Sequence, residues 1–351
     1  MLHTPKAIHL LKQLIATPSL SREEDQTATI IFDFLKAEGA SPQRKLNNVW
    51  ASSIISEKLP TILLNSHHDT VKPSSSWSLD PFQPLEKDGK LYGLGSNDAG
   101  GPLVSLIATF LALKDDPNRP YNLILAATAE EEVSGKNGVE SILPELGKLD
   151  LAIVGEPTQM QMAVAEKGLM VLDCKASGVS GHAARNEGVN AIYKAMQDIE
   201  WFRTFQFELK SELLGPVKMS VTQINAGTQH NVVPDACTFV VDVRTNECYR
   251  NEEALQLIKK HVKNSEVEPR STRINSSFIP LEHPLVQKGL ALGLTYYGSP
   301  TTSDQALIPC TSIKIGPGDS ARSHTADEFI YIEEIERGIE LYIKLLARLK
   351  L

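Results

Sequence analysis

The stretch TILLNSHHDTV, residues 61–71, decides the fold because an apolar run ends there in two histidines and an aspartate. Residues 61–64 have the pattern of a buried strand. His67, His68 and Asp69 then lie just past its carboxyl end, where open α/β sheets bind their ligands. Polar residues also close many ordinary strands, so a solvated loop is the alternative reading of this cluster taken alone.

The composition limits the class of protein and its partners. A chain of 351 residues is long enough for one large or two smaller domains. No apolar run approaches the roughly 20 residues that span a membrane, and the first twenty residues resemble a helix more than a signal peptide. The net charge of -8 gives no basic footprint for nucleic acid. We therefore expect a soluble cytoplasmic protein whose partners include neither nucleic acid nor a membrane.

The cysteines restrict the ligands that a metal site can use. Cys174, Cys237, Cys248 and Cys310 are scattered and form no CxxC pair. This spacing favours free thiols in a reducing compartment and argues against a cysteine-based zinc site. Any metal in this chain would need histidine and carboxylate ligands.

The first half of the chain alternates helical and strand patterns. Ser21 and Glu24 have the spacing of a capping box before an apolar periodic segment that Gly39 can end. Further elements are expected as strands at 61–64, 122–127 and 149–154, with a helix at 103–113. Alternation of this kind predicts an α/β domain with a doubly wound sheet.

The pattern changes from about residue 168 to strands that alternate apolar and polar residues, as half-exposed antiparallel strands do. Helices are expected near 190–202 and 252–263. A strand at 311–315 and an amphipathic helix with isoleucines from Ile332 to Ile343 then return to the first pattern. We therefore predict a first domain made of residues 1–167 and 278–351, with an α+β domain, 168–277, inserted into it.

Residue types that bind metals recur at the ends of the predicted strands. They are His67 and Asp69 after the first run, Glu130, Glu131 and Glu132 after NLILAATA, Glu156 after LAIVG, His324 after TSIKIGPG, and Asp98 in the glycine-rich turn YGLGSNDAGG. Because the carboxyl ends of parallel strands share one edge, these side chains are expected to converge. Histidines and carboxylates without thiolates fit a hydrolytic zinc site or a related divalent metal, and the number of carboxylates allows two ions.

Roles within such a site can be suggested from residue types. A pair of ions needs a bridging carboxylate, and Asp98 is a candidate. Asp69 could orient His67 through its other ring nitrogen if the chain stays extended between them. One of the three adjacent glutamates is a candidate general base. In the loop after the last predicted strand, Gly316 and Gly318 fit either turn positions or backbone amides that hold a carboxylate.

Motifs of rival chemistries fail on inspection. The turn YGLGSNDAGG has Asp98 where GxGxxG needs its third glycine, and GVSGH lacks the last glycine of GxSxG. Neither GxxxxGK[ST] nor HExxH occurs in the sequence. These absences remove most nucleotide-binding and serine-hydrolase interpretations.

Seven ordered motifs resemble the M20 metallopeptidase family, most closely its acetylornithine deacetylase and succinyl-diaminopimelate desuccinylase branch. They are HHDTV, GLGSNDAGG, AEEEVSG, VGEPT, SGHAAR, NVVPD and GPGDSARSHTADEF. The resemblance runs from about residue 5 to 350. It implies that two Zn²⁺ ions per subunit, for which Co²⁺ or Mn²⁺ can substitute, are bound by His67, Asp98, Glu132, Glu156 and His324, with Asp98 bridging.

The same resemblance implies the remaining roles. Glu131 matches the general base, and His68 is the variable residue between His67 and Asp69. The inserted domain would be a ferredoxin-like lid and dimerisation domain of a homodimer. Its His182 would reach the partner subunit's active site and stabilise the oxyanion, with Asn231 nearby, and its Arg244 would grip the substrate's α-carboxylate.

The expected activity is zinc-dependent hydrolysis of a small N-acylated amino acid. The motifs favour N-acetylornithine and a place in arginine biosynthesis, while N-succinylornithine, N-acetylcitrulline, succinyl-diaminopimelate and dipeptides remain open as substrates. A non-catalytic metal or amino-acid binding protein, or a purely structural dimer, would require a broken site. All five ligand positions and Glu131 are intact, which argues against both.

Overall fold

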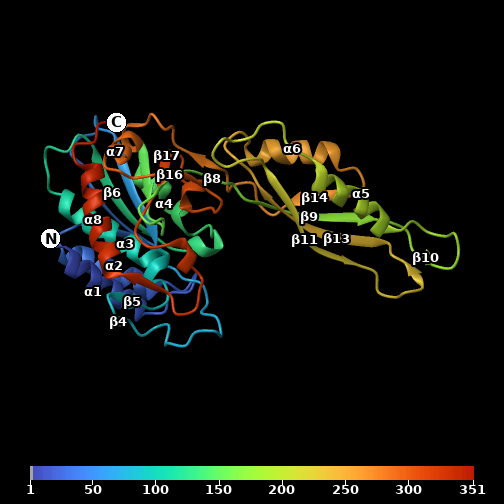
Figure 1. The fold of residues 1–351 in the computed structure, drawn as a ribbon, viewed down its shortest axis with the longest axis horizontal. Helices are drawn as coiled ribbons and strands as arrows, with labels where there is room; N and C mark the ends of the chain where they lie inside the picture. Colours follow the sequence, from blue (N-terminus) through green and yellow to red (C-terminus); the bar gives the residue numbers. More distant parts are fainter. Residues whose placement is uncertain (1–2) are drawn as a thin grey trace. The chain divides into compact units, whose positions relative to one another are not determined.

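The computed structural model describes residues 3–351, which divide into two compact units (Figure 1). Unit 1 comprises the chain through Val164 together with Phe278–Tyr297 and Ser303–Leu351. Unit 2 comprises Ala165–Ser277 and Gly298–Thr302. The inserted unit therefore starts slightly before the boundary expected at residue 168, and it also gains a short segment from the later part of the chain.

Four parallel strands form the middle of the unit 1 sheet, in the spatial order β6, β3, β7, β17. Their bounds are Thr61–His67 for β3, Asn122–Thr128 for β6, Leu151–Val154 for β7 and Thr311–Lys314 for β17. The register pairs His67 with Thr128 and Asn65 with Val154. The carboxyl ends of these strands therefore lie at one edge, as the sequence pattern predicted.

Antiparallel strands extend this sheet on both sides. On one side β2 (Asn48–Ser53) pairs with β6 and β1 (Pro42–Lys45) pairs with β2; on the other, β8 (Met162–Glu166) pairs with β17. β15 (Ser277–Phe278) and β16 (Tyr296–Ser299) pair with β8 and complete the sheet. The result is a mixed sheet with a parallel centre.

Helices cover both faces of the sheet, which explains why every residue of β3 and β6 is buried. On one face α3 (Gly101–Leu113) packs on β3 and β6, and α1 (Thr4–Ile15) and α8 (Ile332–Leu346) pack on α3. On the other face, α4 (Val139–Leu146) contributes to a buried cluster with side chains of β3, β6 and β7. The doubly wound α/β prediction is confirmed.

The other elements of unit 1 lie around this layered centre. α2 (Asp25–Ala37) packs on β1 and β2, and α7 (Pro284–Ala291) packs on α8. A separate sheet consists of β18 (Phe329–Tyr331), β5 (Lys90–Tyr92) and β4 (Leu85–Lys87). Single helical turns occur at Ser96–Gly100 (η1), Glu131–Val133 (η2), Asp304–Ala306 (η3) and Ser320–Arg322 (η4).

The capping box predicted for α2 is wrong. No side chain caps this helix, whose N-cap residue is Glu24. The Ser21 hydroxyl instead donates to Asp69 Oδ2 at 2.7 Å, and Glu24 Oε2 accepts from Asn47 Nδ2 at 2.7 Å. Both side chains have partners from distant parts of the chain, and these partners outweigh the local cap.

Unit 2 has the element order β9, α5, β11, β13, α6, β14. The bounds are Met170–Ser177, Ala191–Thr204, Lys218–Ala226, Ala236–Arg244, Asn251–His261 and Ser265–Pro269. All pairings are antiparallel and the spatial order is β11, β13, β9, β14. This is the ferredoxin-like βαββαβ arrangement. A separate ribbon pairs β10 (Gly181–His182) with β12 (Val232–Val233).

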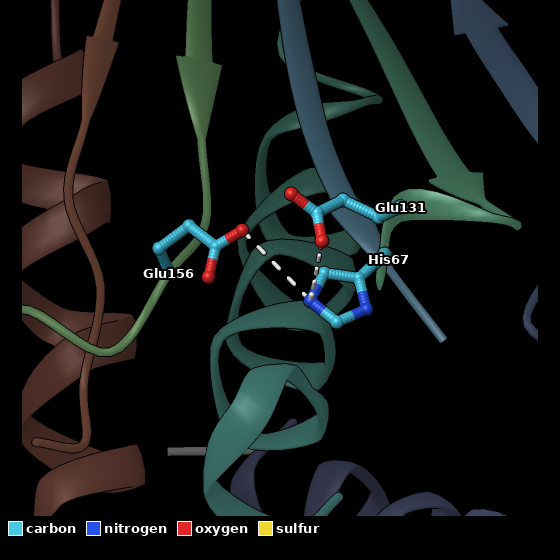
Figure 2. Close-up of side chains that lie close together, drawn as sticks. All are labelled: His67, Glu131 and Glu156. Carbon is cyan, nitrogen blue, oxygen red and sulfur yellow. Dashed lines mark ion pairs between the residues drawn. The ribbon is translucent and has the colours of Figure 1, made fainter. Parts of the chain in front are cut away.

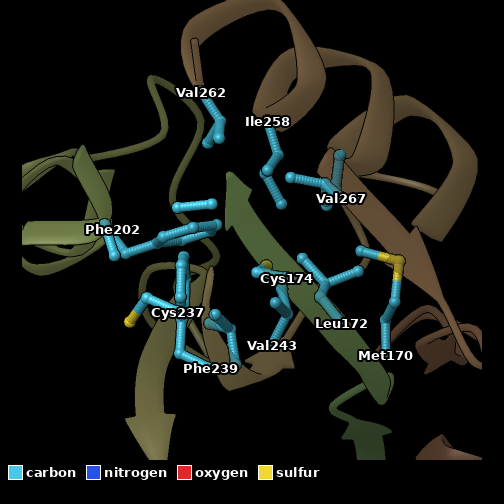
Figure 3. Packing of buried hydrophobic residues seen from close by; sticks show 14 of the residues in the cluster. Met170, Leu172, Cys174, Phe202, Cys237, Phe239, Val243, Ile258, Val262 and Val267 are labelled. Atoms are coloured by element: carbon cyan, nitrogen blue, oxygen red, sulfur yellow. The ribbon is translucent and has the colours of Figure 1, made fainter. Parts of the chain in front are cut away.

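Unit 2 has a hydrophobic core of its own, in which side chains of the sheet pack against those of α5 and α6 (Figure 3). Phe239 of β13 is 1% exposed and meets Phe202 of α5 in a T-shaped contact, with ring centroids 6.1 Å apart. Cys174 and Cys237 are free thiols buried in this core. Within residues 3–351, no helix is both long and apolar enough to cross a bilayer.

We predict that Phe239→Ala destabilises unit 2 by about 3–5 kcal/mol, because it removes a buried ring and leaves a cavity. Hydrogen exchange should detect this as lost protection of β9 and β13, while β3 and β6 stay protected. Tyr193→Ala on α5 is the control, because the Tyr193 side chain is 67% exposed. This variant should change hydrogen exchange little. Equal loss of protection in β3 and β6 would contradict the assignment of a separate core to unit 2.

Candidate metal centre

His67, Glu131 and Glu156 converge at the carboxyl edge of the parallel strands (Figure 2). His67 is the last residue of β3, Glu131 opens the η2 turn after β6, and Glu156 follows β7. The His67 Nε2 atom lies 3.8 Å from Glu156 Oε1 and 4.0 Å from Glu131 Oε2. At these distances the His67 nitrogen and the two glutamate oxygens can contact one common ligand.

A second cluster shares His67 and adds Asp98 with Glu132. The two carboxylate oxygens of Asp98 point to different histidines: Oδ1 lies 3.3 Å from His67 Nε2 and Oδ2 lies 3.7 Å from His324 Nε2. His324 Nε2 is also 3.0 Å from Glu132 Oε2. The Asp98 carboxylate therefore lies between the two histidines.

The electrostatics of the cluster favour a bound cation. Burial, reinforced by Asp98, raises the pKa of Glu156 to about 8. Burial also raises the pKa of Glu131 well above its usual value, although His67 opposes this effect. The hydrogen bond to Glu132 raises the pKa of His324 to about 9. Crowded carboxylates of this kind repel one another, and a divalent cation would relieve the repulsion.

The residues present fit a zinc ion. His67 is 1% exposed, yet its Nε2 atom has no hydrogen-bond partner. A buried polar atom without a partner costs about 1–3 kcal/mol, so this nitrogen is suited to a ligand that the protein alone does not provide. Imidazole nitrogen and carboxylate oxygen are the ligands of hydrolytic zinc sites.

Asp69 orients His67, and it does so chiefly through its main chain. The His67 Nδ1 atom lies 3.0 Å from the Asp69 carbonyl oxygen and 3.4 Å from Asp69 Oδ1. Donation from Nδ1–H to the carbonyl leaves the Nε2 lone pair free for a metal. Burial lowers the pKa of His67, but the nearby carboxylates of Asp69 and Asp98 outweigh this effect and raise that pKa.

The Asp69 carboxylate holds the turn that contains Glu131 and Glu132. It accepts hydrogen bonds from the Glu131 and Glu132 amides at 3.1 and 3.2 Å, in addition to the Ser21 hydroxyl. These bonds fix the η2 turn that presents both glutamates to the cluster. Glu130 precedes this turn with a φ of 56°, and its carboxylate accepts from Asn137.

His68 is buried beside the cluster but belongs to a different network. Its Nε2 lies 2.9 Å from the Asn47 carbonyl oxygen and its Nδ1 lies 2.9 Å from Thr27 Oγ1. Burial lowers the pKa of His68 to about 4. A neutral ring with both nitrogens engaged links the residue after β3 to α2 and to the turn between β1 and β2.

Sequence reasoning missed two buried carboxylates near the cluster. Asp304 is 3% exposed, and its Oδ2 accepts from Asn65 Nδ2 at 2.9 Å and from Thr128 Oγ1 at 2.8 Å. Glu328 is 2% exposed and accepts from backbone amides of the turn that carries Asp98. The only available signal for Glu328 was its closeness in sequence to His324. Asp304 lies in a loop without a recognisable pattern.

The glycines predicted to bind substrate have close packing partners. The Gly316 amide donates to Thr158 Oγ1 at 3.0 Å, and a Cβ at this position would lie 2.5 Å from the Glu156 carbonyl oxygen. Gly318 has a φ of 90°, and a Cβ there would lie 2.6 Å from Asn97 Oδ1. Packing is therefore sufficient to require glycine at both positions.

His182, Asn231 and Arg244 belong to unit 2. His182 is exposed on the β10–β12 ribbon, and its Nδ1 accepts a hydrogen bond from the Ala184 amide at 3.1 Å. The Ala183 amide donates to the Asn231 carbonyl oxygen, which brings Asn231 next to His182. Arg244 forms a two-point ion pair with Asp242 at 2.8 and 3.0 Å.

Comparison with known proteins agrees with this geometry. The chain is 29% identical to an acetylornithine deacetylase of Proteus mirabilis, over 96% of this chain and 95% of the relative. It is 25% identical to a succinyl-diaminopimelate desuccinylase of Verminephrobacter eiseniae, over 98% and 97% of the two chains.

Solved structures share the fold at low sequence identity. An aminopeptidase of Bacillus cereus superposes with a TM-score of 0.79 at 17% identity, covering 99% of this chain and 98% of that chain. A dinuclear metal-binding peptidase of the M20 family from Bacillus subtilis gives 0.75 at 17% identity, covering 98% and 97%. The model of peptidase family M20/M25/M40 matches residues 63–348. The chain therefore belongs to this family and is a metal-dependent hydrolase of amide bonds.

Proposed function

We propose that the chain is a zinc-dependent amidohydrolase that removes the acyl group from a small N-acylated amino acid, with N-acetylornithine as the preferred substrate. The observation that carries this proposal is the arrangement of Glu131 beside His67 and Glu156, with Asp98 between His67 and His324. A carboxylate next to a cluster of metal-ligand types is the arrangement that amide hydrolysis by an activated water requires.

Two Zn²⁺ ions would be held by His67, Asp98, Glu132, Glu156 and His324, with Asp98 shared between them. When bound, the ions polarise the scissile carbonyl and make water a stronger acid and hence a better nucleophile at neutral pH. The remaining chemistry falls to side chains of the protein. Co²⁺ and Mn²⁺ are proposed as substitutes because they accept the same ligand types.

Glu131 is proposed to move the proton. Its carboxylate takes a proton from the attacking water as the new C–O bond forms at the amide carbon. It then delivers that proton to the amide nitrogen as the C–N bond breaks, which releases a carboxylic acid and a free amine. The raised pKa of Glu131, which has burial as its main cause, suits a group that must hold the proton between the two steps.

His182 is proposed to stabilise the oxyanion in the active site of the partner subunit of a homodimer. Acceptance of the Ala184 amide at Nδ1 leaves the neutral ring with its proton on Nε2, a donor that can face an oxyanion. The exposure of His182 is compatible with such a role in a second subunit. Unit 2 would then act as a lid and dimerisation domain.

Substrate binding is proposed for Asn231 and Arg244, and for the loop of Gly316 and Gly318. Arg244 donates two of its five guanidinium N–H groups to Asp242, so the other donors remain for a substrate carboxylate. The Gly316 amide is already engaged by Thr158, which leaves Gly318 as the better candidate in that loop. The full-length similarity to an acetylornithine deacetylase supports N-acetylornithine as the substrate. A place in arginine biosynthesis and a cytoplasmic location belong to the same proposal.

The test of this proposal is hydrolysis of a substrate panel by the zinc-loaded protein, with and without a chelator. The panel contains N-acetylornithine, N-succinylornithine, N-acetylcitrulline, succinyl-diaminopimelate and several dipeptides. We expect the highest kcat/KM for N-acetylornithine, and complete loss of turnover with chelator that added Zn²⁺ restores. A clear preference for dipeptides would retain the hydrolase and overturn the biosynthetic assignment. Turnover that survives metal removal would overturn the mechanism.

We predict that Glu131→Gln keeps bound Zn²⁺ but lowers kcat by about 10²–10⁴, because the amide can neither accept nor return the proton. Zinc content per chain and steady-state kinetics measure the two effects. Glu145→Gln is the control, since Glu145 is exposed and pairs only at the surface with Lys45. Near-normal turnover in Glu131→Gln would show that another group moves the proton.

We predict that His182→Ala alone lowers kcat by about 10²–10³, the usual cost of one lost oxyanion donor. Mixing this variant with Glu131→Gln under conditions of subunit exchange should restore activity. Each mixed dimer would hold one site with an intact Glu131 and an intact partner His182, giving about a quarter of wild-type activity for random pairing. If His182 acted on its own subunit's site, the mixture would stay inactive.

A further inference from the structure

A single buried carboxylate, that of Glu328, accepts hydrogen bonds from several amides of the turn that carries Asp98. Glu328 Oε1 accepts hydrogen bonds from the Asn97 and Asp98 amides, both at 2.8 Å, and Oε2 accepts from the Gly95 amide at 3.0 Å. The Glu328 carbonyl oxygen also accepts from the Gly93 amide at 3.0 Å. One residue thus satisfies main-chain donors along the whole length of the turn.

The shape of the turn creates the need for such an acceptor. Gly93 and Gly95 have φ values of 146° and 75°, and added Cβ atoms would lie 2.3 Å from Ile15 Cγ2 and 2.6 Å from Thr70 Cγ2. The backbone is therefore packed tightly against its neighbours. Buried amides in such a turn need an acceptor, and a carboxylate that accepts several of them is itself compensated for its burial.

Glu328 also belongs to the segment that carries His324. That segment is fastened to the same turn a second time, because Asn97 Nδ2 donates to the Asp319 carbonyl oxygen at 3.0 Å and Asn97 Oδ1 accepts from the Asp319 amide at 2.9 Å. Asp98 and His324 therefore come from two segments that are joined on either side of His324. The 3.7 Å separation of Asp98 Oδ2 from His324 Nε2 depends on these hydrogen bonds between the two segments.

We propose that Glu328 is a positioning residue that holds Asp98 against His324 and thereby secures the second metal position, formed by Asp98, Glu132 and His324. The inference rests on the proposed two-zinc site. Glu328 acts through the backbone of Asp98, since both of its carboxylate oxygens are occupied by amides. The first position shares Asp98 but takes His67 from β3 and Glu156 from the β7 loop, so it depends less on these hydrogen bonds.

Glu328→Gln is the variant that tests the proposal. It conserves size, but its NH₂ group would face at least one main-chain N–H where a carboxylate oxygen now accepts. We expect the first Zn²⁺ to bind with close to wild-type affinity and the dissociation constant of the second to rise about 10–100-fold, the usual effect of altering a group behind a ligand. Calorimetric titration of the metal-free protein with Zn²⁺ measures both steps, and zinc content after dialysis gives the stoichiometry.

Glu333→Gln is the matched control, because this glutamate lies close in the chain on the exposed start of α8. It should bind two ions like the wild type. Equal weakening of both binding steps in Glu328→Gln would mean a general structural role and overturn the proposal, as would an unchanged second step.

Glu328→Asp provides a second variant if the glutamine variant does not fold. It keeps the charge but is one methylene shorter, so it cannot reach all three amides, and the same selective loss of the second ion is expected. Unchanged binding of both ions by this variant would also overturn the proposal. A wild-type protein that binds only one Zn²⁺ would instead contradict the two-zinc site of the proposed function, so the two failures are distinguishable.

Discussion

Repulsion among crowded, half-buried carboxylates is the constraint on which the rest of the structure depends. Glu131, Glu156 and Asp98 crowd around the Nε2 atom of His67 at the edge of the sheet. Burial raises the pKa values of both glutamates, so the protein spends stability on keeping these groups together. Such a cluster is favourable only if a cation balances its negative charge. The parallel strands bring the members of the cluster to one edge of the sheet.

A layer of polar residues behind the cluster keeps the ligand-bearing loops in place. Asp69 fixes the turn of Glu131 and Glu132, and Glu328 fixes the turn of Asp98. Asp304 joins the ends of β3 and β6 through Asn65 and Thr128. In each case a buried carboxylate is stabilised by donors from other segments, and this is how irregular loops can hold side chains as accurately as strands do.

The two units divide the work between separate cores. Unit 1 supplies every residue of the candidate metal centre, from the end of β3 and from loops around a parallel sheet buried on both faces. Unit 2 is an antiparallel sheet with helices and its own packed interior, and it contains the residues proposed to bind substrate and oxyanion. Because the cores are separate, residues of unit 2 can change without disturbing the packing that supports the candidate metal centre.

The sequence by itself determined the four central parallel strands of unit 1 and the positions of the metal-ligand types that follow them. Apolar runs followed by HHD, EEE and GEP are local signals, and both the period of a strand and the residues at its end are readable from neighbours in the chain. The predictions for β3, β6 and α3 were confirmed for this reason.

Local signals failed where a distant partner competed, as when Ser21 bonded Asp69 instead of capping α2. Only the tertiary structure decided that the Asp69 main chain orients His67, that its carboxylate holds the glutamate turn, and that Glu328 fastens Asp98. Hydrogen-bond partners far apart in the sequence leave no periodic pattern, so they become visible only after the chain has folded.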